Sequence, residues 1–123
     1  MTRRILVVDD QEDNRRILRD LLTASGFEVI EAKTGEESVA LAEAETPSLI
    51  LMDIQLPGID GYEATRQIKA RPALSATPLI VVTSYALSGD EAKAFAAGAD
   101  AYVSKPFSPR ALLAKVREFL GPP

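Results

Sequence analysis

Five short apolar runs alternate with longer stretches of helical pattern along this chain of 123 residues. The runs are rich in β-branched residues and lie near 4–8, 28–32, 49–53, 79–83 and 101–104. Strands that alternate with helices are typical of a parallel sheet, because each crossover between parallel strands needs a connecting helix. Right-handed crossovers restrict the arrangement to a doubly wound α/β sheet. Four runs are continuously apolar, as in strands covered on both faces, whereas 28–32 alternates and is expected at an edge.

Short motifs predict where the helices begin and end. A capping oxygen followed three residues later by glutamate occurs at Thr34, Asp60 and Ser88. Ser108 precedes Pro109 in the same role, with proline at the first helical position. Glycines that suit the left-handed residue after a helix are Gly26, Gly98 and Gly121.

Composition narrows the chemistry of the chain. There is no cysteine, which excludes disulfides and thiolate chemistry, and no histidine, which removes the commonest zinc ligand and the commonest general base. Any bound metal is therefore expected to be hard and held by oxygen. The net charge of −4 provides no positive field for nucleic acid or anionic lipid, so binding to either is not expected.

The chain is expected to be a single domain over residues 1–123, with no output domain after the last helix. Its output is then a contact with another protein. No apolar run approaches the roughly 20 residues of a membrane helix. Met1 lies so close to the first predicted strand that no room remains for a signal peptide. A cytoplasmic protein is expected.

Four apolar runs end on residues that suit one phosphoryl and metal site. These residues are Asp9 and Asp10, Asp53, Thr83 and Ser84, and Lys105. The carboxyl ends of parallel strands share an edge, so the side chains are expected around one crevice. Close carboxylates raise one another's pKa unless a cation lies between them, and Mg²⁺ accepts one or two carboxylates while keeping several waters. Such a set suits reversible phosphorylation of a carboxylate.

Each of these residues also has an ordinary structural explanation. Asp9 alone could be a solvated acid, and Asp13 is expected to cap the first helix. Thr83 alone suits a strand position, and a lone lysine such as Lys105 is usually a solvated surface charge. Tyr102 could be a half-buried strand aromatic with its hydroxyl in solvent. The three carboxylates taken together with Lys105 favour a shared site.

Four motifs occur in order: Leu-Val-Val-Asp9-Asp10 with Asn14-Arg15, Met52-Asp53-Ile-Gln-Leu-Pro57-Gly-Ile-Asp-Gly61, Val-Thr83-Ser84, and Tyr102-Val-Ser-Lys105-Pro106-Phe107. This set resembles the receiver domain of two-component response regulators, from the first strand to the last helix. It is most similar to stand-alone, DivK-like or chemotaxis-type receivers. The resemblance implies a flavodoxin-like (βα)5 fold with strand order 2-1-3-4-5.

The resemblance implies that Asp53 accepts a phosphoryl group from a phosphohistidine on a sensor histidine kinase or a histidine phosphotransfer protein. The chain has no histidine of its own, so it cannot be that donor. The metal ligands implied are Asp10, Asp53 and the main-chain carbonyl of Gln55, with Asp9 close by or bridged through water. The ion is Mg²⁺, with Mn²⁺ as an alternative. Lys105 would pair with Asp53 at rest and with the phosphoryl group afterwards.

The resemblance also implies a switch in which Thr83 moves toward the phosphoryl group and Tyr102 turns inward. The face formed by the last strand and the last two helices would then bind a downstream protein target differently. Ser84 and Tyr85 are expected beside the phosphoryl path, and the bond between Lys105 and Pro106 is a candidate cis peptide. The chain would be a monomer or a weak dimer, and would catalyse only its own phosphorylation and dephosphorylation.

Four alternatives compete with this interpretation. A flavodoxin-type FMN protein has the same sheet, but the acidic loop 9–13 would repel the flavin phosphate. A haloacid-dehalogenase-type aspartyl-phosphate hydrolase would carry an Asp-x-Asp motif after the strand. Here the position of the second aspartate in that motif is occupied by Gln55. A receiver cut from a larger hybrid kinase or regulator, or a degenerate scaffold, would retain the fold. The complete set of site residues argues against the scaffold.

Overall fold

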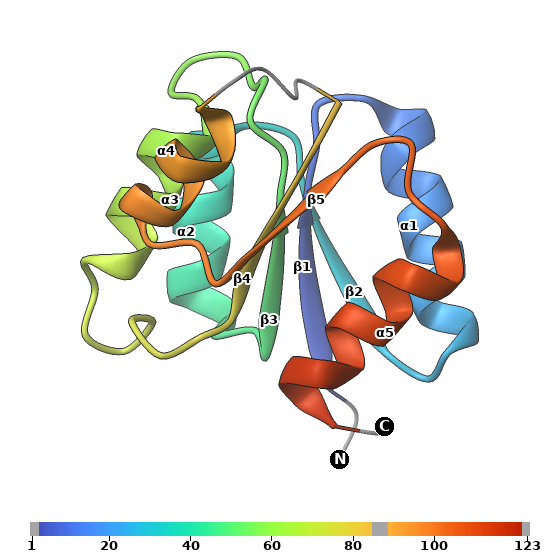
Figure 1. Cartoon of the computed structure of the whole chain (residues 1–123). Helices are drawn as coiled ribbons and strands as arrows, with labels where there is room; N and C mark the ends of the chain where they lie inside the picture. The colour runs from blue at the N-terminus through green and yellow to red at the C-terminus, as the bar shows by residue number, and fades with distance from the viewer. Residues whose placement is uncertain (1–2, 85–88, 122–123) are drawn as a thin grey trace.

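The computed structural model of the chain describes residues 3–84 and 89–121. Strands and helices alternate in the order β1 (Arg4–Val8), α1 (Glu12–Ala24), β2 (Glu28–Ala32), α2 (Gly35–Glu45), β3 (Leu49–Met52), α3 (Gly61–Lys69), β4 (Leu79–Thr83), α4 (Asp90–Ala97), β5 (Ala101–Ser104) and α5 (Pro109–Leu120). The strands form one parallel five-stranded sheet of order β2-β1-β3-β4-β5. Figure 1 shows α1 and α5 on one face and α2, α3 and α4 on the other. The predicted fold class and strand order are confirmed.

Alternate residues of the inner strands build a separate core on each face of the sheet, because successive strand side chains point to opposite faces. Leu6, Ile50 and Val81 belong to the core under α2, α3 and α4. Ile5, Leu51 and Ile80 belong to the core under α1 and α5. β1 beyond its first residue, β3 and β4 are buried throughout. Their ends are therefore held rigidly relative to one another.

The fifth strand differs from the prediction that it is buried on both faces. Ala101 is buried, but Tyr102 and Val103 are half-buried and Ser104 is exposed. The reason is its place in the strand order, since β5 lies at the edge beside β4 and its outer half is only partly covered. β2 is the opposite edge, as its alternation predicts.

Three of the predicted helix caps are found in the structure. Thr34 accepts a hydrogen bond from the backbone N–H of Glu37, and Asp60 accepts one from Glu63. Ser108 caps α5 in the same way, with proline at the start of the helix. These side chains satisfy amide groups that have no partner within the helix.

Of the other two predicted caps, one falls on a residue outside the described chain and one is wrong. Ser88 lies outside the described residues, and the N-cap position of α4 is Gly89, which makes no side-chain capping bond. Asp13 is not the cap of α1, because the helix already begins at Glu12. The Asp13 carboxylate instead forms an exposed ion pair with Arg16, one helical turn ahead.

None of the helices within residues 3–84 and 89–121 is long and apolar enough to cross a membrane.

Candidate functional site

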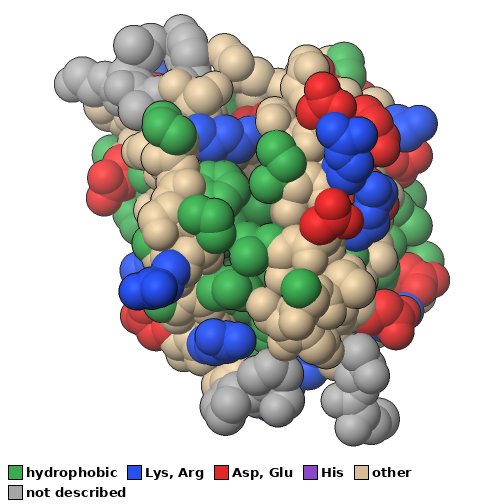
Figure 2. Space-filling model, turned by 90° about the vertical axis from the view of Figure 1, so that its right-hand side faces the viewer, with side chains coloured by type: hydrophobic (Ala, Val, Ile, Leu, Met, Phe, Trp, Pro, Cys, Tyr) green, Lys and Arg blue, Asp and Glu red, His purple; other side chains and the backbone are tan. Residues whose placement is uncertain are grey.

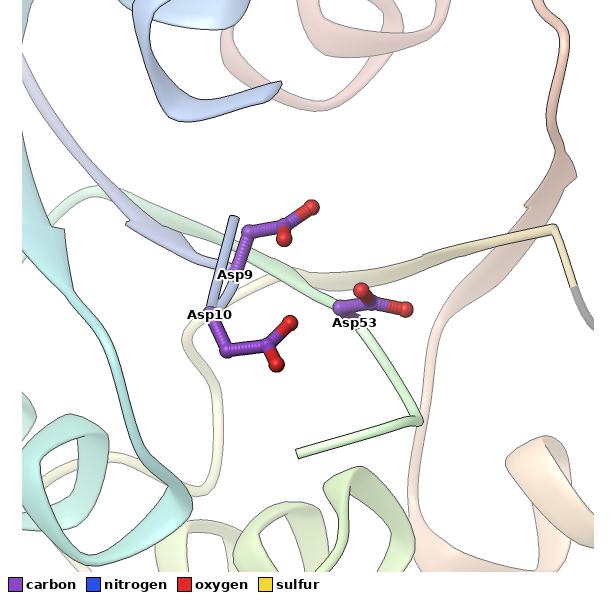
Figure 3. A group of neighbouring side chains, drawn as sticks. All are labelled: Asp9, Asp10 and Asp53. Carbon is purple, nitrogen blue, oxygen red and sulfur yellow. The ribbon is translucent and has the colours of Figure 1, made fainter. Parts of the chain in front are cut away.

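The site lies at the carboxyl ends of β1 and β3. The chain runs from β1 outward to β2 and then returns across β1 to β3, so the crevice between these strand ends is the switch point of the topology, where doubly wound sheets bind ligands. Asp9 and Asp10 follow β1, and Asp53 follows β3 one residue after the strand ends. Figure 3 shows their side chains leaving the neighbouring strand ends toward the same side. One oxygen from each carboxylate lies within 4.8 Å of the others.

Asp9 is buried, and both its backbone N–H and its carboxylate group form hydrogen bonds. Its backbone N–H donates to the carbonyl of Ala32 at 3.1 Å, which extends the pairing of β1 with β2. Its Oδ1 accepts from the backbone N–H of Gln11 at 2.9 Å, and its Oδ2 accepts from the ammonium of Lys105 at 2.9 Å. Both carboxylate oxygens therefore have protein partners. Asp10, by contrast, has an exposed side chain.

Asp53 is 8% exposed, and its backbone N–H donates to the last carbonyl of β1 at 3.0 Å. Burial raises the pKa of its carboxyl group, Lys105 lowers the pKa, and the charge of Asp9 raises it. The backbone N–H groups of Ile54 and Gln55 also lower it, the Ile54 N–H lying 2.7 Å from Oδ1. The raised pKa shows that desolvation outweighs the favourable contacts. A cation near Asp53 would offset that cost.

Lys105 connects the fifth strand with the acidic crevice. Its ammonium hydrogen-bonds to Asp9 at 2.9 Å and forms a longer ion pair with Asp53 at 3.7 Å. Its backbone N–H donates to the carbonyl of Thr83 at 2.8 Å, which carries the pairing of β4 and β5 one residue further. The peptide bond to Pro106 is cis. Sequence reasoning placed Lys105 in this crevice but paired it with Asp53, whereas the closer partner is Asp9.

The loop after Asp53 is held by a close approach of α3. The backbone N–H of Gly61 donates to the carbonyl of Ile54 at 2.9 Å. A Cβ at Gly61 would lie 2.0 Å from the carbonyl oxygen of Asp53, so only glycine fits. This contact fixes the start of the loop that carries Gln55, whose side chain is exposed.

The remaining predicted site residues lie at the ends of the last two strands. Thr83 is fully buried at the end of β4, and Ser84 is exposed directly after it. Tyr102 is half-buried in β5, and burial, followed by the charges of Asp90 and Glu91, raises its pKa. The predicted access residue Tyr85 lies outside the described residues.

The donors in the crevice fit a hard divalent ion. Carboxylate and carbonyl oxygens are the ligands that Mg²⁺ prefers, and the three carboxylates are close enough to share one ion. Asp10 and Asp53 are the better candidates for direct contact, because both oxygens of Asp9 already accept hydrogen bonds from the protein.

Comparison with known families identifies the chain. The response regulator receiver domain family matches residues 5–117. The chain belongs to this family. It is a receiver domain of two-component signalling, and its general function is that of a phosphorylation-dependent switch. Membership of the family implies a histidine kinase or phosphotransfer partner. The predicted resemblance is confirmed.

Individual relatives agree with this assignment. The polar-differentiation response regulator DivK of Brucella ovis is 41% identical over 121 residues, which cover 98% of each chain. A CheY-like receiver domain protein from Methanospirillum hungatei JF-1 has a similar structure, with a TM-score of 0.88 and 39% identity over 96% of this chain and 93% of that chain. The receiver domain of the sensor histidine kinase PA1611 from Pseudomonas aeruginosa PAO1 has a TM-score of 0.91 and 34% identity over 98% of this chain and 99% of that chain. That structure has a magnesium ion coordinated in its active-site cleft.

Sequence reasoning missed one residue of this receiver that contacts the site. Arg15 entered only as part of a motif, yet it is buried in α1 and donates to the carbonyl of Asp9. The signal was present in the spacing, because Arg15 shares the buried stripe of α1 with Leu18 and Leu22, three and seven residues further on. A charged residue on an apolar stripe requires buried partners.

Proposed function

We propose that Asp53 is the phosphoacceptor of this receiver and takes its phosphoryl group from a phosphohistidine of a sensor kinase or phosphotransfer protein. A carboxylate oxygen of Asp53 forms the new bond to phosphorus while the bond to the donor's imidazole nitrogen breaks, and the imidazole keeps the electron pair and gains a proton. The observation that carries the proposal is one arrangement, in which the buried Asp53 lies 3.7 Å from the ammonium of Lys105 and close to the carboxylates of Asp9 and Asp10.

In this proposal, Asp10, Asp53 and the backbone carbonyl of Gln55 would hold Mg²⁺, and Asp9 would act through water. The bound ion would neutralise charge on the phosphoryl oxygens. Lys105 supplies a second positive charge on the side of the crevice formed by β5, where its ammonium is within 4.0 Å of two carboxylates. Mn²⁺ has the same preference for oxygen ligands and would substitute.

The switch would follow from the added charge. Phosphorylation adds about −1.5 to −2 charges and three acceptor oxygens at Asp53. Thr83 and Lys105 are joined by a backbone hydrogen bond at the ends of β4 and β5, so the groups proposed to contact the phosphoryl oxygens belong to one hydrogen-bonded pair. Tyr102, three residues before Lys105, would respond with them. The surface of α4, β5 and α5 would then change its affinity for a protein target.

A cavity next to the acidic crevice supports the proposal that the donor protein docks on α1. Its volume is about 370 Å³, and its walls include Ile17 and Leu18 of α1 and Pro106 and Phe107 after β5. Lys105 lines the same cavity, so the cavity lies beside the residue that pairs with the proposed acceptor. Figure 2 shows hydrophobic side chains gathered down the middle of this face, with a cluster of acidic and basic side chains to the right and further charged side chains to the left. An apolar ridge of the donor would fill it while its phosphohistidine reaches Asp53.

We propose that this receiver acts in the cytoplasm as a monomer or weak dimer. It modifies only itself, by taking up and losing its own phosphoryl group. It contacts a kinase or phosphotransfer protein and a downstream target, but neither nucleic acid nor membrane.

Acetyl phosphate with Mg²⁺ tests the assignment without a partner protein. Intact mass should show one added phosphoryl group in the wild type and none in Asp53→Asn. Glu45→Gln is the matched control, because Glu45 is ion-paired with Arg4 at the first residue of β1, the opposite end of the strand from Asp9 and Asp10. Uptake by Asp53→Asn equal to that of the control would refute the assignment. Release of many phosphates per chain from small esters would instead indicate a hydrolase.

A further inference from the structure

Arg15 is a buried guanidinium whose three nitrogens all have protein partners. The residue is 3% exposed. Its Nη1 donates to the backbone carbonyl of Asp9 at 2.7 Å, and its Nε donates to Glu31 Oε1 at 3.2 Å. Its Nη2 donates to Glu12. The planar guanidinium thus spans the end of β1, the end of β2 and the start of α1, which a lysine ammonium cannot do.

The contact with Asp9 bears on Asp10. The carbonyl that Arg15 holds belongs to the planar peptide unit that joins Asp9 to Asp10, so fixing the carbonyl fixes the direction in which the chain enters Asp10. The other hydrogen bonds of Asp9 use its N–H, which donates to Ala32, and its carboxylate, which accepts from Gln11 and Lys105; none of them holds the carbonyl of the peptide that leads into Asp10. Arg15 is the side chain that holds this carbonyl, and so the peptide between the buried Asp9 and the exposed Asp10.

The charge of Arg15 is largely cancelled where it sits. Glu12 and Glu31 each contact the guanidinium, and Glu31 also contacts Arg19 at 2.9 Å. The Arg15 cation therefore adds little field at the acidic crevice. Its contribution to the crevice is the position of the Asp9 carbonyl that it holds.

We infer that Arg15 is a positioning residue, which holds the Asp9–Asp10 peptide so that the Asp10 carboxylate faces Asp53 and the divalent-ion site is formed before the ion binds. The inference rests on the proposed role of Asp10 as a metal ligand. Partners that orient metal ligands in this way typically change metal affinity by 10- to 100-fold when they are removed. Arg15→Lys keeps the charge and loses the planar fork, and is expected to bind Mg²⁺ about tenfold more weakly.

Arg19→Gln is the matched control. Arg19 shares the partner Glu31 with Arg15, but its side-chain contacts are with Glu31 and Asp20 rather than the Asp9 carbonyl. Isothermal titration with Mg²⁺ in the absence of phosphoryl donor should therefore give wild-type affinity for Arg19→Gln and weaker binding for Arg15→Lys. Equal affinities in the two folded variants would overturn the inference, because loss of the Glu31 contact alone would then explain both.

Two further variants, Asp10→Asn and Glu31→Gln, separate a failure of the metal assignment from a failure of the inference about Arg15. If Asp10→Asn binds Mg²⁺ as well as the wild type, the metal assignment fails together with the inference. If Asp10→Asn loses affinity while Arg15→Lys does not, the inference about Arg15 fails alone. Should Arg15→Lys not fold, Glu31→Gln loosens the same guanidinium, and its Mg²⁺ affinity should fall below that of Arg19→Gln. Equal affinity of Glu31→Gln and Arg19→Gln would then refute the role.

Discussion

Lys105 makes its short contact with Asp9, with 2.9 Å between Nζ and Oδ2, and lies 3.7 Å from Asp53. The buried Asp9 carboxylate therefore holds the ammonium at the edge of the crevice, within reach of the proposed acceptor. A phosphoryl group on Asp53 would draw Lys105 away from Asp9, since a doubly charged acceptor attracts the ammonium more strongly than a carboxylate does.

Removal of this ammonium is expected to slow phosphorylation and weaken the response. Lys105→Ala deletes one charge-assisted hydrogen bond to the phosphoryl oxygens, worth about 1.5–3 kcal/mol, so uptake from acetyl phosphate should slow by about 10- to 100-fold. Intact mass over time measures the rate, and hydrogen exchange of β5 measures the response. Lys115→Ala, on the surface of α5, is the control. Wild-type rate and exchange in Lys105→Ala would contradict the assignment.

Neutralising Asp53 should stabilise the fold at neutral pH. Burial raises the pKa of Asp53, so the folded state favours its protonated form. That contribution is present below the ordinary value of 3.8 and is lost as the pH rises through the folded pKa. Asp53→Asn should therefore have a higher free energy of unfolding than the wild type at pH 7, and the difference should vanish below pH 3.8. Urea denaturation at both pH values measures it; a less stable variant at pH 7 would be the opposite of this expectation.

Tyr62 should titrate later than an ordinary tyrosine. Burial, followed by the charge of Asp90, raises the pKa of Tyr62 from 10.0 to about 12, and its hydroxyl donates to the backbone carbonyl of Asp90 at 3.4 Å. Because the unfolded chain releases this proton near pH 10.0, the free energy of unfolding should fall between pH 10.0 and about 12. Tyrosinate absorbance compared between the wild type and Tyr62→Phe isolates the group. A difference titrating near pH 10 would contradict the expectation.

Gly61→Ala should disturb the site and not only the fold. The added Cβ would meet the Asp53 carbonyl at 2.0 Å, and neither the helix nor the strand end can yield freely. We expect a loss of about 1–3 kcal/mol in the free energy of unfolding, together with slower phosphoryl uptake. Gly89→Ala is the contrast, because its Cβ meets nothing within 4 Å and only its left-handed backbone, at φ +90°, is strained. Unimpaired uptake in folded Gly61→Ala would exclude this steric coupling.

Thr65→Val should stabilise the protein. Thr65 is fully buried in α3, and its Oγ1 has no hydrogen-bond partner within the described chain. Replacing the hydroxyl by a methyl group should raise the free energy of unfolding by about 1 kcal/mol. Ser38→Ala should do the reverse, because the equally buried Ser38 hydroxyl donates to the carbonyl of Gly35 at 2.6 Å. Thermal denaturation of both variants provides the comparison, and a destabilised Thr65→Val would contradict it.

The sequence predicts the sheet and the crevice well because both follow from local patterns. Continuous apolar runs mark β1, β3 and β4, and the polar residues that end them gather because parallel strands finish at one edge. The caps at Thr34 and Asp60 were readable for the same reason, since capping is a contact over three residues.

The features of the fold and site that the sequence did not predict depend on contacts between segments that are distant in the chain. The choice of Asp9 as the close partner of Lys105 spans 96 positions and is decided by the geometry of two strand ends. The exposure of β5 follows from its place at the edge, which its apolar residues do not encode. Arg15 was missed because its partners, the Asp9 carbonyl and Glu31, come from two different strands.

The three carboxylates and one ammonium in the crevice also determine which ionic charge would balance the site. With all four groups ionised, the crevice has an excess of two negative charges. One divalent ion restores electroneutrality, whereas a sodium or potassium ion leaves a charge uncompensated in a partly desolvated place. The number of acids that the two strand ends bring together would therefore favour a divalent ion over the abundant monovalent ions of a cell.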